Sequence, residues 1–127
     1  MKIEKLHQVA VLSRDLNETR TFYEESLGAR LLAYFKGPPG LLFFDFFGTR
    51  ILFERAAPSA TIYFWVDDIN AAHEELKAKG IEFTHEPRAI FRDDQGIFGE
   101  SGHEEWMAFF KDPSGNTLAL ATQRPPG

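Results

Sequence analysis

The chain has 127 residues, of which 43% are hydrophobic and 13 are phenylalanine, and it carries a formal net charge of −5. Its length suits one domain or two small modules that share a core. The acidic balance argues against binding to nucleic acid or to an anionic membrane surface. The absence of cysteine excludes a disulfide scaffold, thiol catalysis and thiolate zinc sites. Because the N-terminus is charged and lacks an apolar signal core, we expect a cytoplasmic protein.

The first half of the chain predicts a strand, a helix and three further strands. Asp15 is a suitable N-cap with Glu18 three residues later, and Gly28 ends the helical pattern. Strands are predicted at residues 3–12, 29–35, 41–47 and 50–55, where apolar, β-branched and aromatic residues lie between turn residues.

The second half of the chain repeats this pattern after roughly 60 residues. A strand at residues 61–66 precedes a helix that Asp67 or Asp68 caps and Gly80 ends, and another strand is predicted at 81–84. A closing hairpin joins 106–111 to 117–121 through Asp-Pro-Ser-Gly-Asn, whose residues favour a tight turn. The sequence thus predicts an α+β chain of two βαβββ modules, residues 1–55 and 61–127, with a linker at 56–60.

Residues 86–103 form a polar, glycine-containing segment that is longer than its counterpart in the first half. Long segments of this kind serve as lids or binding loops, or are surface excursions without a role. Both interpretations stay open for this segment.

Three stretches carry a resemblance to a known family: LHQVAVLSRDLNETRTFYEESLGA, YFWVDDINAAHEELKAKGIEF and MAFFKDPSGNTLAL. Together with the module repeat, they resemble the vicinal oxygen chelate superfamily, which contains glyoxalase I, bleomycin-resistance proteins and extradiol dioxygenases. The resemblance implies a curved eight-stranded mixed sheet around a cleft, with the helices on its outer face. It also implies a homodimer.

In metal-using members of that superfamily, four His, Gln or Glu ligands come from the first and last strand of each module. The matching positions, counted from the helix caps and turn glycines, are Gln8, Leu52, Thr61 and Ala119. Only Gln8 is a good ligand, and a shift of two residues that brings in Glu54 would give no more than two. We therefore predict no metal centre, with a divalent metal as the minority alternative.

Strand alternation predicts which side chains face the cleft. Apolar residues at the alternate strand positions, such as Val11 and Phe53, should point away from the cleft and lie under the helices. His7 should face the helix side or the end of the sheet. Small alanines opposite Tyr63 and Trp65 would leave an apolar slot for a ligand. The predicted cleft set is Gln8, Ala10, Leu12, Arg50, Leu52, Glu54, Thr61, Tyr63, Trp65, Thr117, Ala119 and Ala121.

Each candidate ligand-binding or catalytic residue also has an ordinary structural interpretation. Glu54 is a candidate general base or a solvated strand end, and Arg50 recognises an anionic ligand or is an exposed strand residue. Tyr63 and Trp65 form a ligand platform or a dimer contact. Trp106 closes the cleft or packs in the core.

The other histidines are weaker candidates. We expect His73 to be solvated beside Glu74 and Glu75 on its helix. His85 and His103 flank the 86–103 segment and its acidic residues, which would form a displaced metal site or simply keep the loop hydrated.

Two classes of function follow. The first is a glyoxalase/bleomycin-resistance-like protein that binds a small organic molecule in an aromatic cleft without a metal. The second is a lyase, isomerase or dioxygenase of the same superfamily, acting through a metal or through Glu54. Fold alone does not decide between them.

Overall fold

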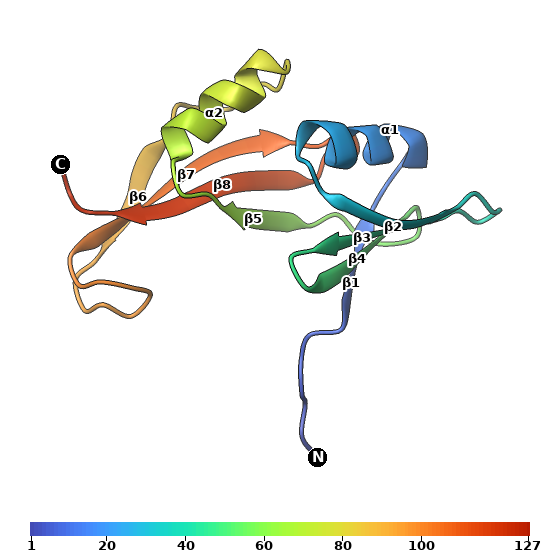
Figure 1. The fold of residues 1–127 in the computed structure, drawn as a ribbon, viewed down its shortest axis with the longest axis horizontal. Coiled ribbons are helices and arrows are strands. Elements are labelled where there is room, and N and C mark those ends of the chain that lie inside the picture. Colours follow the sequence, from blue (N-terminus) through green and yellow to red (C-terminus); the bar gives the residue numbers. More distant parts are fainter. The chain divides into compact units, whose positions relative to one another are not determined.

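The computed structural model describes all 127 residues and divides into two compact units. Unit 1 comprises Met1–Ala60 with Asp112–Asn116, and unit 2 comprises Thr61–Lys111 with Thr117–Gly127. Each unit contains a four-stranded mixed sheet and helical structure on one face of it (Figure 1). No helix of the structure has the length and apolar composition needed to cross a membrane.

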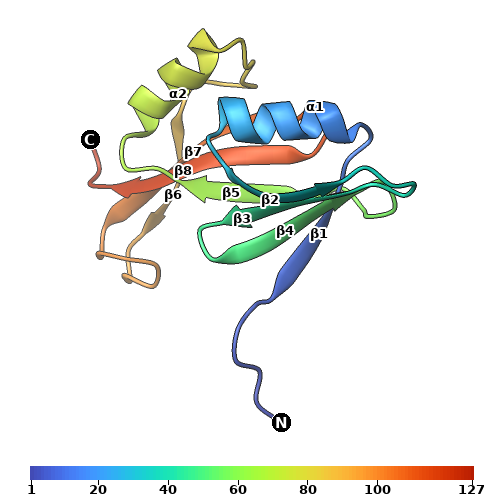
Figure 2. The ribbon, with the colours of Figure 1, turned by 45° about the vertical axis from the view of Figure 1, so that its right-hand side comes forward.

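Unit 1 holds the first βαβββ module. The strand order is β1-β4-β3-β2, in which β1 and β4 are parallel and the other neighbours are antiparallel. The α-helix α1 continues into a short π-helix, η1, and α1 contacts β3 and β4 (Figure 2). The elements are β1 (Gln8–Leu12), α1 (Leu16–Thr21), η1 (Phe22–Ser26), β2 (Arg30–Phe35), β3 (Leu41–Phe46) and β4 (Thr49–Glu54).

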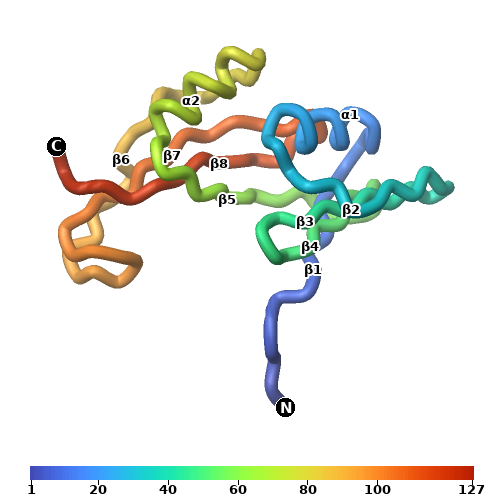
Figure 3. The backbone as a smooth tube through the Cα atoms, in the orientation of Figure 1, coloured from blue at the N-terminus to red at the C-terminus, as the bar shows by residue number.

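The predicted first strand is shorter than expected. It begins at Gln8, which pairs with Arg50, and not at Ile3. Its parallel partner β4 begins at Thr49, so the preceding residues have no neighbouring backbone with which to pair. They lead away from the sheet (Figure 3) and are exposed.

An aromatic cluster fills the space between the helical segment and the sheet of unit 1. The Tyr23 ring is fully buried and lies 4.6 Å from the Phe53 ring and 6.0 Å from the Phe44 ring, centroid to centroid. Val11 on the neighbouring strand is also fully buried. These contacts confirm that the face carrying Val11 and Phe53 is the one that the helical segment covers.

Unit 2 repeats the topology with the order β5-β8-β7-β6, and β5 is parallel to β8. The α2 helix contacts β7 and β8, and its N-cap is Asp68, whose carboxylate accepts the Ala71 N–H at 3.0 Å. The order βαβββ is therefore confirmed for both modules, and the eight strands pair as two sheets of four. The elements are β5 (Thr61–Trp65), α2 (Ile69–Ala78), β6 (Arg88–Asp93), β7 (His103–Lys111) and β8 (Thr117–Arg124).

The strand predicted at residues 81–84 is wrong. Only Phe83 forms an isolated bridge there, with Phe110, while the strand β6 lies at Arg88–Asp93 inside the segment that looked like a loop. β6 is an edge strand whose first five residues are all exposed, so it lacks the alternation of apolar and polar residues that marks a half-buried strand.

His73 is also not solvated as expected. Its side chain is 3% exposed, and its ring lies 4.4 Å from the Phe83 ring. Ile69 and Leu76 are buried on the same helix at i−4 and i+3, so His73 lies in the middle of the buried stripe. The polar neighbours Glu74 and Glu75 obscure this position in the sequence.

The Asp112 carboxylate organises the turn between β7 and β8. Its Oδ1 accepts the backbone N–H groups of Ser114 and Asn116, both at 2.9 Å. Its Oδ2 accepts the Tyr23 hydroxyl at 2.7 Å and the Asn116 side-chain amide at 2.8 Å. A buried carboxylate needs such partners, because an unpaired buried charge is very costly.

Further hydrogen bonds join this turn to the first module. The Asn116 amide donates to the Leu12 carbonyl and its Oδ1 accepts the Ala60 N–H, both at 2.8 Å. The Ser114 hydroxyl accepts the Arg14 N–H at 2.8 Å. The turn, although it connects two strands of unit 2, is therefore part of unit 1, whereas the sequence division placed it in the second module.

We predict that Asp112→Asn lowers the free energy of unfolding by about 2–4 kcal/mol, because an amide cannot accept the same four hydrogen bonds. Urea denaturation at neutral pH measures this change. Asp15→Asn is the matched control, since Asp15 accepts the Glu18 N–H as an exposed helix cap and Asn caps equally well. An Asp112→Asn variant as stable as the control would contradict this role of the carboxylate.

A second prediction concerns alkaline pH. Burial, and then the neighbouring Asp112 carboxylate, raise the pKa of Tyr23 far above its ordinary value. The unfolded chain loses this proton near pH ~10 while the folded protein keeps it, so this contribution to stability is complete below that pH and falls above it.

Tyr23→Phe should lower the free energy of unfolding at neutral pH by about 1–3 kcal/mol and reduce its decline at alkaline pH. Urea midpoints measured from neutral pH to about pH 11 test both effects. An alkaline decline as steep in the variant as in the parent would show that Tyr23 is not its source.

Candidate functional site

The face of the unit 1 sheet away from the helical segment carries a polar pair at Gln8 and Arg50. These residues are direct neighbours on the parallel strands β1 and β4. The Arg50 Nε–H donates to Gln8 Oε1 at 2.7 Å. The structure therefore brings together two of the predicted ligand-binding residues through a direct hydrogen bond.

His7 also contacts this pair. Its Nε2 lies 3.1 Å from Arg50 Nη2. A guanidinium can only donate, so His7 Nε2 is the acceptor of this contact. His7 precedes β1 and lies at the end of the sheet, one of the two positions that its parity allowed.

Two phenylalanines that were not among the predicted site residues extend the same face. The Arg50 guanidinium lies over the Phe43 ring, 5.6 Å from its centroid. Phe35 packs edge-on against Phe43 at 6.1 Å and is 58% exposed. Phe43 pairs with Leu52 on one side and Ala33 on the other, which places Phe43 and Phe35 on this face. The sequence alone could not show this, because it does not give the register of the strands.

The corresponding face of unit 2 carries Tyr63 and Trp65. They are 55% and 59% exposed, which is high for large aromatic side chains. Tyr63 lies opposite Ala119, and its ring contacts the Phe109 ring at 6.1 Å. Ala119 is fully buried and leaves the Tyr63 ring uncovered from that side.

Two buried polar atoms of unit 2 lack a hydrogen-bond partner within the chain. They are His85 Nε2 and Glu105 Oε2. The His85 ring contacts Phe109 at 5.8 Å, and its Nδ1 donates to the Glu86 carbonyl at 2.7 Å. Glu105 shares the strand parity of Phe109, so both atoms belong to the face that carries Tyr63.

Trp106 lies on the opposite face from Tyr63. Along β7, its side chain points to the face opposite that of Phe109. The buried residues Ala108 and Phe110 lie on the same face as Trp106. The Arg124 guanidinium stacks on its ring at 3.6 Å. Trp106 was expected either to close the cleft or to pack in the core, and the structure places it on the α2 side of the sheet, away from Tyr63.

Glu54 lies at the far end of β4 from Arg50. It pairs with Leu12 while Arg50 pairs with Gln8, which separates Glu54 from Gln8 by four strand residues, roughly 13 Å. Glu54 instead lines a separate groove of about 770 Å³, whose wall includes Arg14, Arg55, Lys36, Pro38 and Pro39. Gln8 and Glu54 therefore cannot share one metal ion.

The four positions that correspond to metal ligands do not fit a metal. Leu52 and Ala119 have no donor atom on their side chains and are buried. The Gln8 Oε1 already accepts from the Arg50 guanidinium, a cation that would repel a metal ion. Thr61 is an exposed neutral hydroxyl, a poor ligand for a divalent ion.

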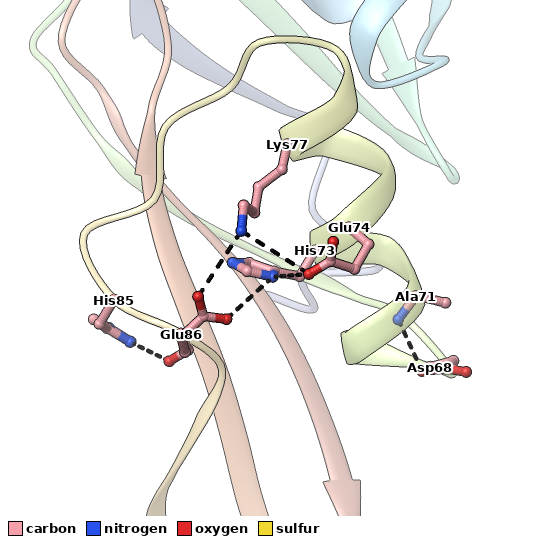
Figure 4. Close-up of polar contacts among 7 residues, drawn as sticks. All are labelled: Asp68, Ala71, His73, Glu74, Lys77, His85 and Glu86. Carbon is pink, nitrogen blue, oxygen red and sulfur yellow. Dashed lines mark hydrogen bonds and ion pairs between the residues drawn. The ribbon is translucent and has the colours of Figure 1, made fainter.

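A different cluster in unit 2 has the residue types of a cation site (Figure 4). His73, Glu74 and Glu86 place ligand atoms within 4.8 Å of one another. The Lys77 ammonium lies 4.0 Å from Glu74 and 3.9 Å from Glu86, between the same two carboxylates. This cluster already contains its own cation and reads as an ion-pair network between α2 and the segment after it.

The segment 86–103 contains β6 and an ordered loop. Asp93 accepts the N–H groups of Phe98 at 2.8 Å and Ile97 at 2.9 Å, and these bonds lower its pKa. His103 lies 3.2 Å from Glu100. His85 and His103 are not brought together with the acidic residues as a metal-binding group.

The family model for the Glyoxalase/Bleomycin resistance protein/Dioxygenase superfamily matches residues 5–120. The chain therefore belongs to this superfamily, as the sequence motifs indicated. A comparison with curated proteins finds none that matches this chain.

Solved structures share the fold at low sequence identity. TnmS3, an antibiotic binding protein from Streptomyces sp. CB03234, is 21% identical with a TM-score of 0.75, covering 98% of this chain and 99% of its own. A superfamily member from Sphaerobacter thermophilus DSM 20745 is 20% identical with a TM-score of 0.72, covering 94% and 97%. An integron cassette protein of V. cholerae is 21% identical with a TM-score of 0.73, covering 96% and 97%. These likenesses show the fold alone.

Proposed function

We propose that this protein binds a small organic molecule on the helix-free face of its unit 2 sheet and does so without a catalytic metal. The observation that carries the proposal is the pair of half-exposed aromatic side chains on β5, Tyr63 and Trp65, beside the small residue Ala119. Superfamily membership supports it, and so does the fold shared with an antibiotic binding protein.

Aromatic rings on an uncovered sheet face suit a planar apolar ligand. Tyr63, Trp65 and Phe109 offer stacking and edge contacts. The unpartnered His85 Nε2 and Glu105 Oε2 add polar groups of the kind that orient a ligand in an otherwise apolar site. An N–H or O–H group of the ligand would satisfy either atom, which otherwise costs folding free energy.

The chemistry of the residues at the expected ligand positions argues against a bound metal. Of the four positions matching the superfamily's ligands, only Gln8 offers a good donor, and its amide oxygen already binds Arg50. A tight metal site needs three or more convergent ligands. The site accordingly relies on shape, aromatic surface and hydrogen bonds.

An acid–base enzyme acting through Glu54 is the second candidate. The groove beside Glu54 supports it, because a substrate could reach the carboxylate there. The side chain of Glu54, however, forms none of the structure's hydrogen bonds or ion pairs. A general base needs a fixed orientation toward the proton that it removes, so binding is the better-supported function.

We also propose that the protein works in the cytoplasm as a homodimer. The exposed Tyr63 and Trp65 are compatible with a subunit contact as well as with a ligand platform. Sedimentation at several protein concentrations would separate these two uses of the face.

The two tryptophans provide the test of ligand binding. We expect small aromatic compounds that bind to change the emission of Trp65, which is exposed beside Tyr63, and to leave Trp106 unchanged under Arg124. The signal should disappear in Trp65→Phe and persist in Trp106→Phe. Tyr63→Ala should weaken binding by about three- to ten-fold through lost ring contact.

Fluorescence titration of the wild type and the two tryptophan variants with a library of aromatic compounds measures these effects. Failure of every compound, or ligand signals confined to Trp106, would contradict the proposal. Emission of Trp65 that changes on dilution alone would assign the face to self-association instead.

A further inference from the structure

Arg50 is an oriented cation without an acidic partner. Its side chain is half-buried and takes part in none of the ion pairs of the structure. Gln8, His7 and the Phe43 ring each contact the guanidinium and hold it in one position. None of these three groups carries a negative charge, so the charge of the guanidinium stays available to another partner.

The edges of the guanidinium show which of its donors are available. Nε–H donates to Gln8, and Nη2 donates one N–H to His7. Nη1 has no partner within the chain, and Nη2 keeps a second N–H. A guanidinium that presents one N–H from each Nη side by side matches the two oxygens of a carboxylate.

The charges nearby favour an anion of single charge. Asp45 lies opposite both Arg30 and Arg50 in the sheet, but its two oxygens bind Arg30 at 3.5 Å and the Gly48 N–H at 2.9 Å. The two guanidinium groups and the one carboxylate together leave one net positive charge. One net charge suits a carboxylate better than a dianionic phosphate.

The surface beside Arg50 is aromatic. Phe43 lies under the guanidinium, and Phe35 packs against Phe43 with 58% of its surface exposed. A ligand whose carboxylate binds Arg50 could therefore place an apolar or aromatic body on these two rings.

We propose that Arg50, with Phe43 and Phe35 beside it, recognises the carboxylate of a small aromatic or apolar carboxylic acid on the unit 1 sheet, so that such acids are a ligand class of this protein. This inference rests on the proposed binding function. The Gln8 amide acts as a positioning group, because it binds the guanidinium and orients the donors that remain free.

Benzoate, its neutral analogue benzamide and phenyl phosphate are the probes, and binding is followed by NMR titration of the labelled protein. We expect benzoate to bind roughly ten-fold or more tightly than benzamide. Arg50→Gln should reduce benzoate affinity to that of benzamide. Arg50→Lys keeps the charge but loses the paired donors, so most of the preference should also disappear.

Arg20→Gln is the matched control, because Arg20 is an arginine of the same unit that lies on α1 and already pairs with Glu24. It should leave benzoate affinity within about two-fold of the wild type. Thermal melts of each variant establish that it is folded, and Arg50→Lys serves as the readout should Arg50→Gln not fold.

Equal affinity for benzoate and benzamide, no loss in either Arg50 variant, or no benzoate binding at all would overturn the inference. Tighter binding of phenyl phosphate with the same Arg50 dependence would overturn the carboxylate assignment. Aromatic compounds that still change Trp65 emission would, in each case, leave the binding function standing. Failure of both experiments would remove both proposals.

Discussion

The fold depends on one buried carboxylate. Asp112 accepts four hydrogen bonds, two from the backbone of its own turn and two from the side chains of Asn116 and Tyr23. Tyr23 in turn lies at the centre of the aromatic core of unit 1. These bonds fix the turn between β7 and β8 within unit 1. They therefore also fix the residue at which β7 ends, Lys111, and the residue at which β8 begins, Thr117.

The candidate site follows from the register that this turn fixes. Because β8 starts at Thr117, Ala119 lies opposite Tyr63 and Phe109, and the leucines on either side of it face α2. A slip of β8 by one residue would turn its leucines to the helix-free face and Ala119 toward α2. In unit 1, the parallel register of β1 and β4 likewise places Gln8 beside Arg50. Two helix-free faces with different chemistry result, one aromatic and one carrying an oriented cation.

Local sequence patterns predicted much of this structure. Asp15 and Asp68 cap the two helices as expected, and strand alternation separated the buried Val11 and Phe53 from the opposite face, because caps and alternation depend on neighbouring residues. Long-range contacts were beyond such reasoning. β6 has no alternation because it is an edge strand, and His73 is buried because Phe83 packs on it from beyond the helix. The Gln8–Arg50 and Phe43 contacts likewise required the strand pairing.

The central claim is that this superfamily member works through binding surface and an arginine, without a metal. Elemental analysis of protein purified without chelator, followed by thermal melts with added nickel, zinc, manganese and iron(II), tests it most directly. The account predicts no stoichiometric metal and no ion-specific rise in Tm. A stoichiometric metal that persists in Glu86→Gln, which disables the His73 cluster, and disappears in Gln8→Ala would contradict it.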